Sequence, residues 1–174
     1  MTEQHEYSRR IPKEFVTVVL RAQLHGDGPR MEAIETALEE LAQGKKLTHW
    51  IWYAFTQRNG LGKSPRSQKF AVHSFAELAA LLNDSEVSAN LVRAYATVEI
   101  TLSSGLVPSL TVLFDGDVRK VVSSSTLFND YLERQSRLSS DLSYLQRAAR
   151  PLLAAGLAMG LPPCAISLKL SAGT

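Results

Sequence analysis

Hydrophobic residues recur at helical spacing along most of the chain. The clearest stripe predicts a helix over residues 85–102, because its apolar side chains fall three or four positions apart. These side chains are Val87, Leu91, Tyr95, Val98 and Leu102. Asn83-Asp84-Ser85 supplies cap residues before this helix, and Ser103-Ser104-Gly105 ends it. The chain therefore contains at least one long amphipathic helix.

The same periodicity predicts four further helices, over residues 30–43, 75–82, 118–132 and 142–158. Each has a boundary signal. Pro29 suits the first position of the first helix, and Gly44 stops it. Ser74 opens the second helix with a capping box. Asp117 precedes the third as a cap residue, and Ser139-Ser140-Asp141 precedes the fourth.

Four segments have less decisive patterns. Residues 14–24 combine a β-branched run with helical spacing, and residues 107–114 fit either a strand or a short helix. Residues 49–58 indicate a short aromatic helix with Thr48 as its cap. Residues 165–170 are compatible with a tail that lies extended against the body.

Because most periodic segments are helical, we predict a mainly α fold: a single compact multi-helix domain with at most one or two short extended segments. The 174 residues are enough to bury one sizeable core. Residues 1–12 form a flexible N-terminal arm in this prediction, and residues 13–174 form the helical domain.

Composition narrows the functional classes. The chain has 45% hydrophobic and 21% charged residues, and its net charge of +2 argues against binding to nucleic acid. The start is polar, and the longest apolar run, residues 151–163, is too short to span a bilayer. We therefore expect a cytoplasmic protein without a membrane partner. Cys164 is the single cysteine and the four histidines are scattered, so we expect no disulfide, no metal site and no cofactor.

One stretch departs from this near-neutral average. Residues 41–76 contain no Asp or Glu, and all six of their cations are in its central part: Lys45, Lys46, Arg58, Lys63, Arg66 and Lys69. Several aromatic side chains stand among them: Trp50, Trp52, Tyr53 and Phe55. A positive field with aromatic faces suits a phosphate or carboxylate ligand that carries a flat ring. The alternative is that the aromatic residues are core and the cations form a solvated face.

Gly62-Lys63-Ser64 matches the end of a nucleotide-binding P-loop. The complete motif needs a glycine at position 57, where the chain has Gln57, and a buried strand before it. The preceding segment has a helical pattern instead, and Pro65 disfavours helical geometry at Ser64. We therefore reject a P-loop.

Two motifs resemble those of domain of unknown function family 1810, a bacterial family. The first is "GKKLTHWIWYAFTQRNGLGKSPRSQKFA", which runs from Gly44 to Ala71. The second is "DVRKVVSSSTLF", which runs from Asp117 to Phe128. The resemblance covers about residues 15–133. Thr56 departs from it, because the family has proline there.

The resemblance implies a compact, mostly helical fold and no established activity. In helical layout and polar motifs the family is also distantly similar to N-glycosidases that act on ADP-ribose-like or riboflavin-precursor nucleotides. That similarity implies hydrolysis of an N-glycosidic bond. Residues 134–174 have no counterpart in the family pattern, and we interpret them as a C-terminal helical extension and tail.

Two residues are candidates for catalysis, and two for stacking. His49 or Asp117 would activate water as a general base. Trp50 or Tyr53 would stack on the base of a nucleotide. Trp50 and Trp52 are two positions apart and so point to different faces of a helix; at most one of them meets a ligand.

The remaining ligand candidates are backbone amides, hydroxyls and cations that suit phosphate or sugar. They are Gly60, Gly62, Lys63, Ser64, Arg66, Ser67, Lys69, Lys120, Ser123, Ser124 and Thr126. Each has a structural interpretation as well: the glycines as a helix-ending turn, Asp117 and Lys120 as a cap and an ion pair, and the hydroxyls as caps or helix bends.

The leading functional prediction is a pocket for a small anionic, nucleotide-like ligand, formed by residues 45–69 and the helix that follows Asp117. The alternative is a non-catalytic protein-interaction module that uses residues 45–70. A ligand-sized concave pocket containing both motifs would favour the first, and a flat exposed aromatic patch the second. Whether the chain is an enzyme, and whether it binds a protein partner or forms a homo-oligomer, stays open at this point.

Overall fold

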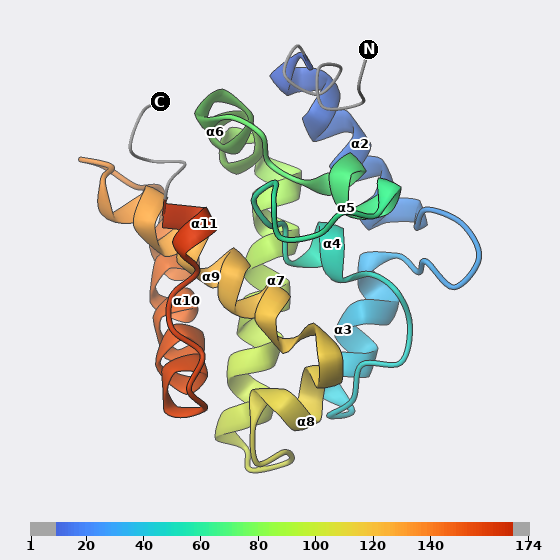
Figure 1. Cartoon of the computed structure of the whole chain (residues 1–174), viewed down its shortest axis with the longest axis vertical. Coiled ribbons are helices and arrows are strands. Elements are labelled where there is room, and N and C mark those ends of the chain that lie inside the picture. Colours follow the sequence, from blue (N-terminus) through green and yellow to red (C-terminus); the bar gives the residue numbers. More distant parts are fainter. Residues whose placement is uncertain (1–9, 169–174) are drawn as a thin grey trace.

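The computed structural model describes residues 10–168, and within this range it contains helices and no β-strand (Figure 1). Two isolated β-bridges join Gly28 to Met31 and Arg58 to Val72. The predicted mainly α fold class is confirmed. Most of the predicted N-terminal arm and the last residues of the tail, 1–9 and 169–174, lie outside the described residues.

The long helix α7 (Ser85–Ser103) runs through the middle of the molecule (Figure 1). Its predicted stripe is confirmed, because Val87, Leu91, Tyr95 and Val98 are fully buried and Leu102 packs against the same core. The carboxylate of Asp84 caps it as predicted, by accepting hydrogen bonds from two first-turn amides. Helices α3 (Ile34–Ala42) and α10 (Ser140–Ala158) both pack against α7.

Helix α9 (Val118–Glu133) packs along α10. Every residue from 121 to 128 is buried, including its serines and threonine. The short α8 (Leu110–Phe114) and the 3₁₀ turn Asp115–Asp117 lead into it, and the four-residue α11 (Ala165–Leu168) packs on it.

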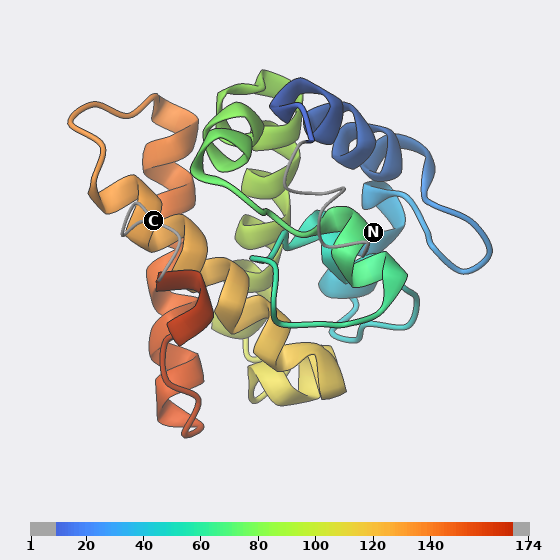
Figure 2. The ribbon, with the colours of Figure 1, turned by 45° about the horizontal axis from the view of Figure 1, so that its top comes forward.

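Helix α2 (Pro12–His25) packs on α6 (Phe75–Asn83), and both lie at the end of the molecule where α7 begins (Figure 2). The two short helices α4 (Ile51–Ala54) and α5 (Pro65–Phe70) lie beside α2. Ser74 caps α6 through a hydrogen bond from the Glu77 amide, as the capping box predicts.

The structure settles the undecided segments in favour of helices. Residues 14–24 belong to α2, and most of residues 107–114 belong to α8. The expectation of an extended tail is wrong for the described residues 165–168, which form α11. The Pro29 prediction is also wrong: the Gly28–Met31 turn delays the start of α3 until Ile34.

The predicted aromatic helix 49–58 is shorter than expected. It ends at Ala54, because Gln57 and Arg58 leave helical geometry to meet the strand-like residue Val72. Thr48 is not its cap, since the cap position is Trp50 and the Thr48 hydroxyl donates a hydrogen bond to Glu40 instead.

Candidate functional site

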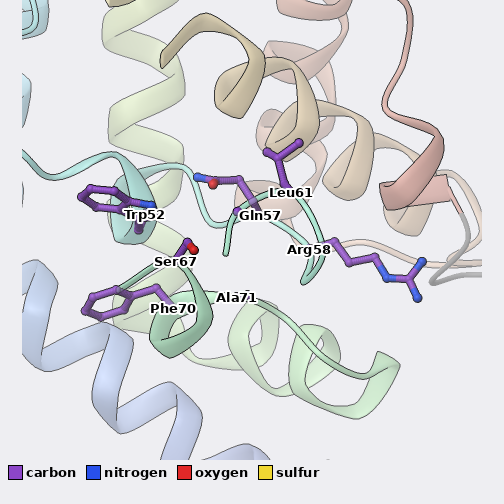
Figure 3. Close-up of a pocket in the computed structure, with 9 residues that line it drawn as sticks. Trp52, Gln57, Arg58, Leu61, Ser67, Phe70 and Ala71 are labelled. Carbon is purple, nitrogen blue, oxygen red and sulfur yellow. The ribbon is translucent and has the colours of Figure 1, made fainter. Parts of the chain in front are cut away.

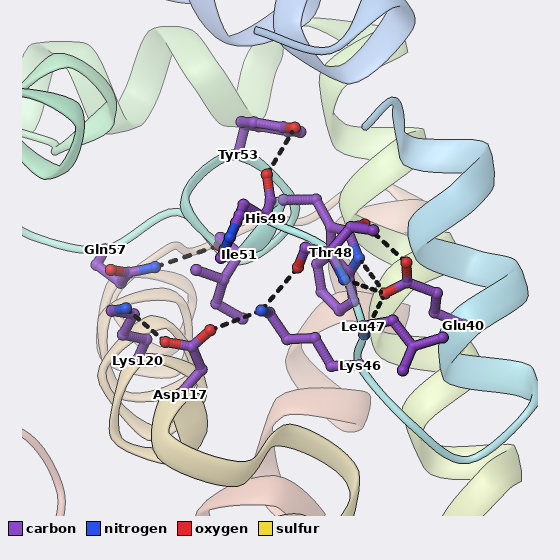
Figure 4. Close-up of polar contacts among 11 residues, drawn as sticks. Glu40, Lys46, Leu47, Thr48, His49, Ile51, Tyr53, Gln57, Asp117 and Lys120 are labelled. Carbon is purple, nitrogen blue, oxygen red and sulfur yellow. Dashed lines mark hydrogen bonds and ion pairs between the residues drawn. The ribbon is translucent and has the colours of Figure 1, made fainter. Parts of the chain in front are cut away.

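The first half of the first family motif, which begins at Gly44, is organised around one buried carboxylate, Glu40 of α3 (Figure 4). One of its oxygens accepts hydrogen bonds from the amides of Leu47 (2.7 Å) and Thr48 (3.1 Å) and from Trp50 Nε1 (2.8 Å). The other accepts the Thr48 hydroxyl at 2.7 Å. Burial acts to raise the pKa of Glu40, but these hydrogen bonds outweigh it and hold the pKa below its usual value. Glu40 therefore fixes the turn that leads into α4.

Trp50 and Tyr53 belong to the core. Both are completely buried, and the Tyr53 hydroxyl donates hydrogen bonds to the Glu32 and His49 carbonyls. Burial raises the pKa of Tyr53 far above its usual range. The prediction that Trp50 or Tyr53 stacks on a ligand is therefore wrong. Trp52, in contrast, is half-buried.

Asp117 joins the two motifs through ion pairs (Figure 4). One oxygen meets Lys46 Nζ at 2.8 Å and the other meets Lys120 Nζ at 2.5 Å. Burial acts to raise the pKa of Asp117, but the hydrogen bonds from Lys120 and Lys46 prevail and lower it. A carboxylate with both oxygens engaged by cations is a poor proton acceptor. The two motifs nevertheless lie next to each other in space, as predicted.

His49 forms no ion pair with the described residues. Its backbone amide donates to the Arg30 carbonyl at 2.9 Å, and its residue is exposed. It does not line the groove described below. The proposed base role of His49 thus gains no support from its position.

Three hydroxyls predicted to contact a ligand are buried in α9 and bind other parts of the protein. Ser124 accepts a hydrogen bond from the Tyr95 hydroxyl at 2.9 Å. Thr126 donates to the Val122 carbonyl and accepts from the Cys164 amide. Ser123 contacts Ser167 of α11, with 3.0 Å between their hydroxyl oxygens. We therefore leave these three residues out of the small-molecule site.

The glycines of the first motif make a tight turn before α5. Gly60 has φ +103°, a conformation that favours glycine. A Cβ at Gly62 would lie 2.7 Å from the Ser67 side chain, so only glycine fits this close approach. Ser64 caps α5 by accepting from the Ser67 amide at 3.1 Å. The hydroxyls of Ser64 and Ser67 are thus used in local structure.

A small void lies behind this turn, next to Trp52, Gln57 and Phe70 (Figure 3). Its volume of about 10 Å³ is close to that of a single water molecule. The void is too small for a nucleotide and cannot be the ligand site.

An open groove lies on the outer side of the same segment, with a volume of about 550 Å³. Its walls come from three separate parts of the chain: Asp27, Trp52, Ser64, Pro65, Arg66 and Lys69. The Arg66 guanidinium lies 5.7 Å from the centre of the Trp52 ring, and Lys120 Nζ lies 4.9 Å from it. The Trp52 indole N–H is buried and has no hydrogen-bond partner among the described residues. The groove thus combines an aromatic surface with nearby cations.

The positive charge of residues 41–76 is reduced by acids from elsewhere. Lys46 pairs with Asp117, and Lys69 Nζ lies 2.5 Å from an Asp27 oxygen. Arg66 is exposed and forms no ion pair with the described residues. Its charge therefore remains available to a ligand.

Two further findings concern metal binding and membrane-spanning helices. No group of three or more metal-binding side chains is close enough among residues 10–168 to hold an ion. Over the same range, no helix combines the length and apolar character needed to cross a membrane.

The chain belongs to the family of proteins of unknown function designated DUF1810, whose sequence pattern matches residues 25–150. A search of curated proteins gave no match. Its structure is similar to the crystal structure of the conserved hypothetical protein Rv1873 from Mycobacterium tuberculosis, with a TM-score of 0.62 and 23% sequence identity. That similarity covers 94% of this chain and 97% of the other. It extends the shared fold beyond the family match, to almost the whole chain.

Proposed function

We propose that the groove beside Trp52 binds a small anionic, nucleotide-like ligand. The observation that carries the proposal is the environment of Trp52 itself. This half-buried indole lines an open groove and has cations from two separate elements, α5 and α9, near its ring. An aromatic surface beside fixed positive charge suits a ligand that joins a flat ring to a phosphate or carboxylate.

The groove offers complementary contacts for both parts of such a ligand. The ring of the ligand packs against the open surface of Trp52. Its anionic group accepts hydrogen bonds from Arg66, whose planar guanidinium can donate to two oxygens at once, and from Lys69. The volume of about 550 Å³ is within the range of small-molecule sites.

Hydrolysis of an N-glycosidic bond is the catalytic form of this proposal. Asp27 is the carboxylate that lines the groove, whereas Asp117 is held by Lys46 and Lys120. One Asp27 oxygen pairs with Lys69, and among the described residues nothing donates a hydrogen bond to the other. That oxygen is the group best placed to activate a water molecule or to bind a sugar hydroxyl.

The interaction-module alternative has less support. It depends on an exposed aromatic patch, but Trp50, Tyr53 and Phe55 are fully buried. Trp52 alone among the four aromatic residues of positions 50–55 reaches the surface. One half-buried indole is a small contact area for a protein partner.

The test is a thermal-shift comparison on the full chain with AMP, adenosine, ribose 5-phosphate and inorganic phosphate. AMP should raise the melting temperature most, because it alone supplies both the ring and the charge. Adenosine or phosphate alone should have a smaller effect. Equal shifts from AMP and phosphate would contradict the role of Trp52, and no shift from any anion would contradict the site.

Catalysis is measured separately, by chromatographic detection of free adenine after incubation with AMP or ADP-ribose. Asp27→Asn should abolish base release while AMP still raises the melting temperature. If the unmodified chain binds AMP and releases no base from either nucleotide, the proposal reduces to a binding protein. If Asp27→Asn releases base at the original rate, Asp27 is not the base.

A further inference from the structure

The C-terminal segment 164–168 lies in a cleft between the two family motifs. On one side the segment contacts the loop 58–62, through Arg58 and Gly60, and on the other it contacts α9, on which α11 packs. Arg58 Nη1 donates to the Ile166 carbonyl at 2.5 Å. The Cys164 amide donates to the Thr126 hydroxyl at 3.0 Å. The cleft thus holds the backbone of this segment from both sides.

Ser167 is the side chain that enters the cleft most deeply. It is completely buried, and its hydroxyl donates to the Ser123 carbonyl at 3.0 Å. The Ile166 side chain packs against Gly60, since a Cβ built there would be in ordinary van der Waals contact with it, at 3.4 Å. The cleft therefore contacts four groups of the segment: the Ile166 carbonyl, the Cys164 amide, the Ser167 hydroxyl and the Ile166 side chain.

Arg58 is the strongest donor in the cleft, and a carbonyl is its acceptor. No carboxylate among the described residues pairs with it. Burial lowers the pKa of Arg58. The cleft also continues past the segment into a mainly apolar cavity of about 320 Å³, whose walls include Leu61, Val122 and Leu161. Arg58, which pairs with no described carboxylate, and the adjoining cavity could both make further contacts with a bound peptide.

We infer that this cleft is a recognition site for a short peptide and that residues 164–168 are its tethered ligand. The peptide it fits is a single helical turn with an apolar residue followed by serine. This site is separate from the Trp52 groove and does not depend on the function proposed there.

The docking of the segment is close to balance energetically. It rests on a few hydrogen bonds, each of which contributes little net free energy. Ala165 and Leu168 stay exposed, so little apolar area is buried in return for ordering five residues. The segment can therefore leave the cleft while the helical core stays folded.

The test uses a fluorescent peptide of residues 161–168, with serine in place of Cys164, added to full-length protein. Ser167→Asp places a carboxylate beside the buried Ser123 carbonyl and should release the tethered segment. This variant should bind the peptide at least roughly tenfold more tightly than the unmodified chain. Leu168→Asp is the matched control, because Leu168 is 41% exposed and should leave the cleft occupied. Anisotropy gives both affinities.

Specificity is tested with a peptide in which the residues corresponding to Ile166 and Ser167 are exchanged; it should bind roughly tenfold more weakly or not at all. Arg58→Ala added to Ser167→Asp should weaken the original peptide by a similar factor. Equal binding of the two peptides, or no binding to a folded Ser167→Asp chain, would overturn the inference. Loss of folding in Ser167→Asp would overturn it too, because the segment would then be an integral part of the core.

Hydrogen exchange on the unmodified chain is an independent check. The Cys164 and Leu168 amides should exchange much faster than those of α7, since the segment opens without global unfolding. Exchange of both groups at the same rate would show that the segment leaves only when the whole protein unfolds.

Discussion

Trp50 and Trp52 are two residues apart and lie in opposite environments. Trp50 is completely buried and donates its indole N–H to Glu40. Trp52 lines an open groove beside Arg66 and Lys120, and its N–H has no acceptor within residues 10–168. Within one motif, the Trp50 indole N–H is therefore paired inside the fold, whereas that of Trp52 is not.

The difference shows how a structural element and a candidate site can be separated. Unpaired buried polar groups cost free energy, so a core normally pairs them. Glu40 accepts four hydrogen bonds and leaves nothing for a ligand. Arg66 contacts an aromatic ring and pairs with no described acid, which leaves its donors free to bind.

The largest expected effect is the contrast between Trp50→Ala and Trp52→Ala. Trp50→Ala should lower the free energy of unfolding by about 3–5 kcal/mol, because it removes a buried ring and leaves Glu40 without one donor. Trp52→Ala should cost only about 1–2 kcal/mol, since the side chain is partly exposed and its N–H is already unpaired. Urea denaturation measures both. Equal losses would show that Trp52 is as much a core residue as Trp50.

Acid should destabilise the Glu40 region. The pKa of Glu40 is lower in the folded protein than its usual value of 4.5, so its ionised form stabilises the fold above the unfolded pKa. That contribution should disappear as the pH falls from about 5 through the folded pKa. Asp117 has its pKa shifted in the same direction and adds to the acid slope.

Glu40→Gln separates the two carboxylates. Glutamine keeps an oxygen for the three N–H donors, and its amide can donate to the Thr48 hydroxyl, so the cost at pH 7 should be about 1–2 kcal/mol. The stability of the variant should depend less on pH below about 5. Glu35→Gln is the control, because Glu35 forms an exposed pair with Arg93 and should change little. An unchanged acid slope in Glu40→Gln would mean that Glu40 does not titrate with folding.

The sequence predicted the helices that depend on local signals. Asp84 and Ser74 cap helices as expected, because capping involves residues only two or three positions away. Asp117 stands at the expected cap position of α9, but its side chain makes no capping hydrogen bond. Pro29 was misread because it lies in the Gly28–Met31 turn, and Thr48 because a contact with another helix overrides its local preference. Thr48 gives its hydroxyl to Glu40, eight residues earlier.

The pocket between the two motifs stays a prediction: the motifs meet, but the groove walls include no residue of the helix that follows Asp117. The basic, aromatic stretch and the Asp117 helix do meet, through the Lys46–Asp117 pair. Helical spacing also predicted that Trp50 and Trp52 face different ways. Which of them is buried depends on Glu40 in another helix, and Asp27 in the groove comes from a turn with no motif of its own.

A smaller effect is expected from Arg66→Ala, on binding rather than on folding. Its melting temperature should hardly change, because Arg66 is exposed and unpaired among the described residues. The affinity for AMP, measured by calorimetry, should fall roughly tenfold, and added salt should weaken binding more in the parent than in the variant. Lys63→Ala is the matched control, since Lys63 is exposed and lies outside the groove walls. If Arg66→Ala unfolds the protein, the arginine is structural.

The smallest expected effect tests whether the buried region is wholly structural. Thr56 is completely buried, yet its hydroxyl has no hydrogen-bond partner in the part of the chain that the structure describes. Thr56→Val removes the unpaired oxygen and keeps the shape, so it should raise stability by up to about 1 kcal/mol. Thr101→Val is the matched control: Thr101 is also buried, but its hydroxyl donates to the Leu41 carbonyl at 3.0 Å. That variant should lose about 1 kcal/mol, because the carbonyl loses its donor.

Urea denaturation measures the stability of both variants. A gain in Thr56→Val and a loss in Thr101→Val would confirm that the buried Thr56 hydroxyl destabilises the core because it is unpaired. A loss in both variants would mean that Thr56 has a polar partner in solution, and this part of the motif would then belong with Trp52 rather than with Trp50.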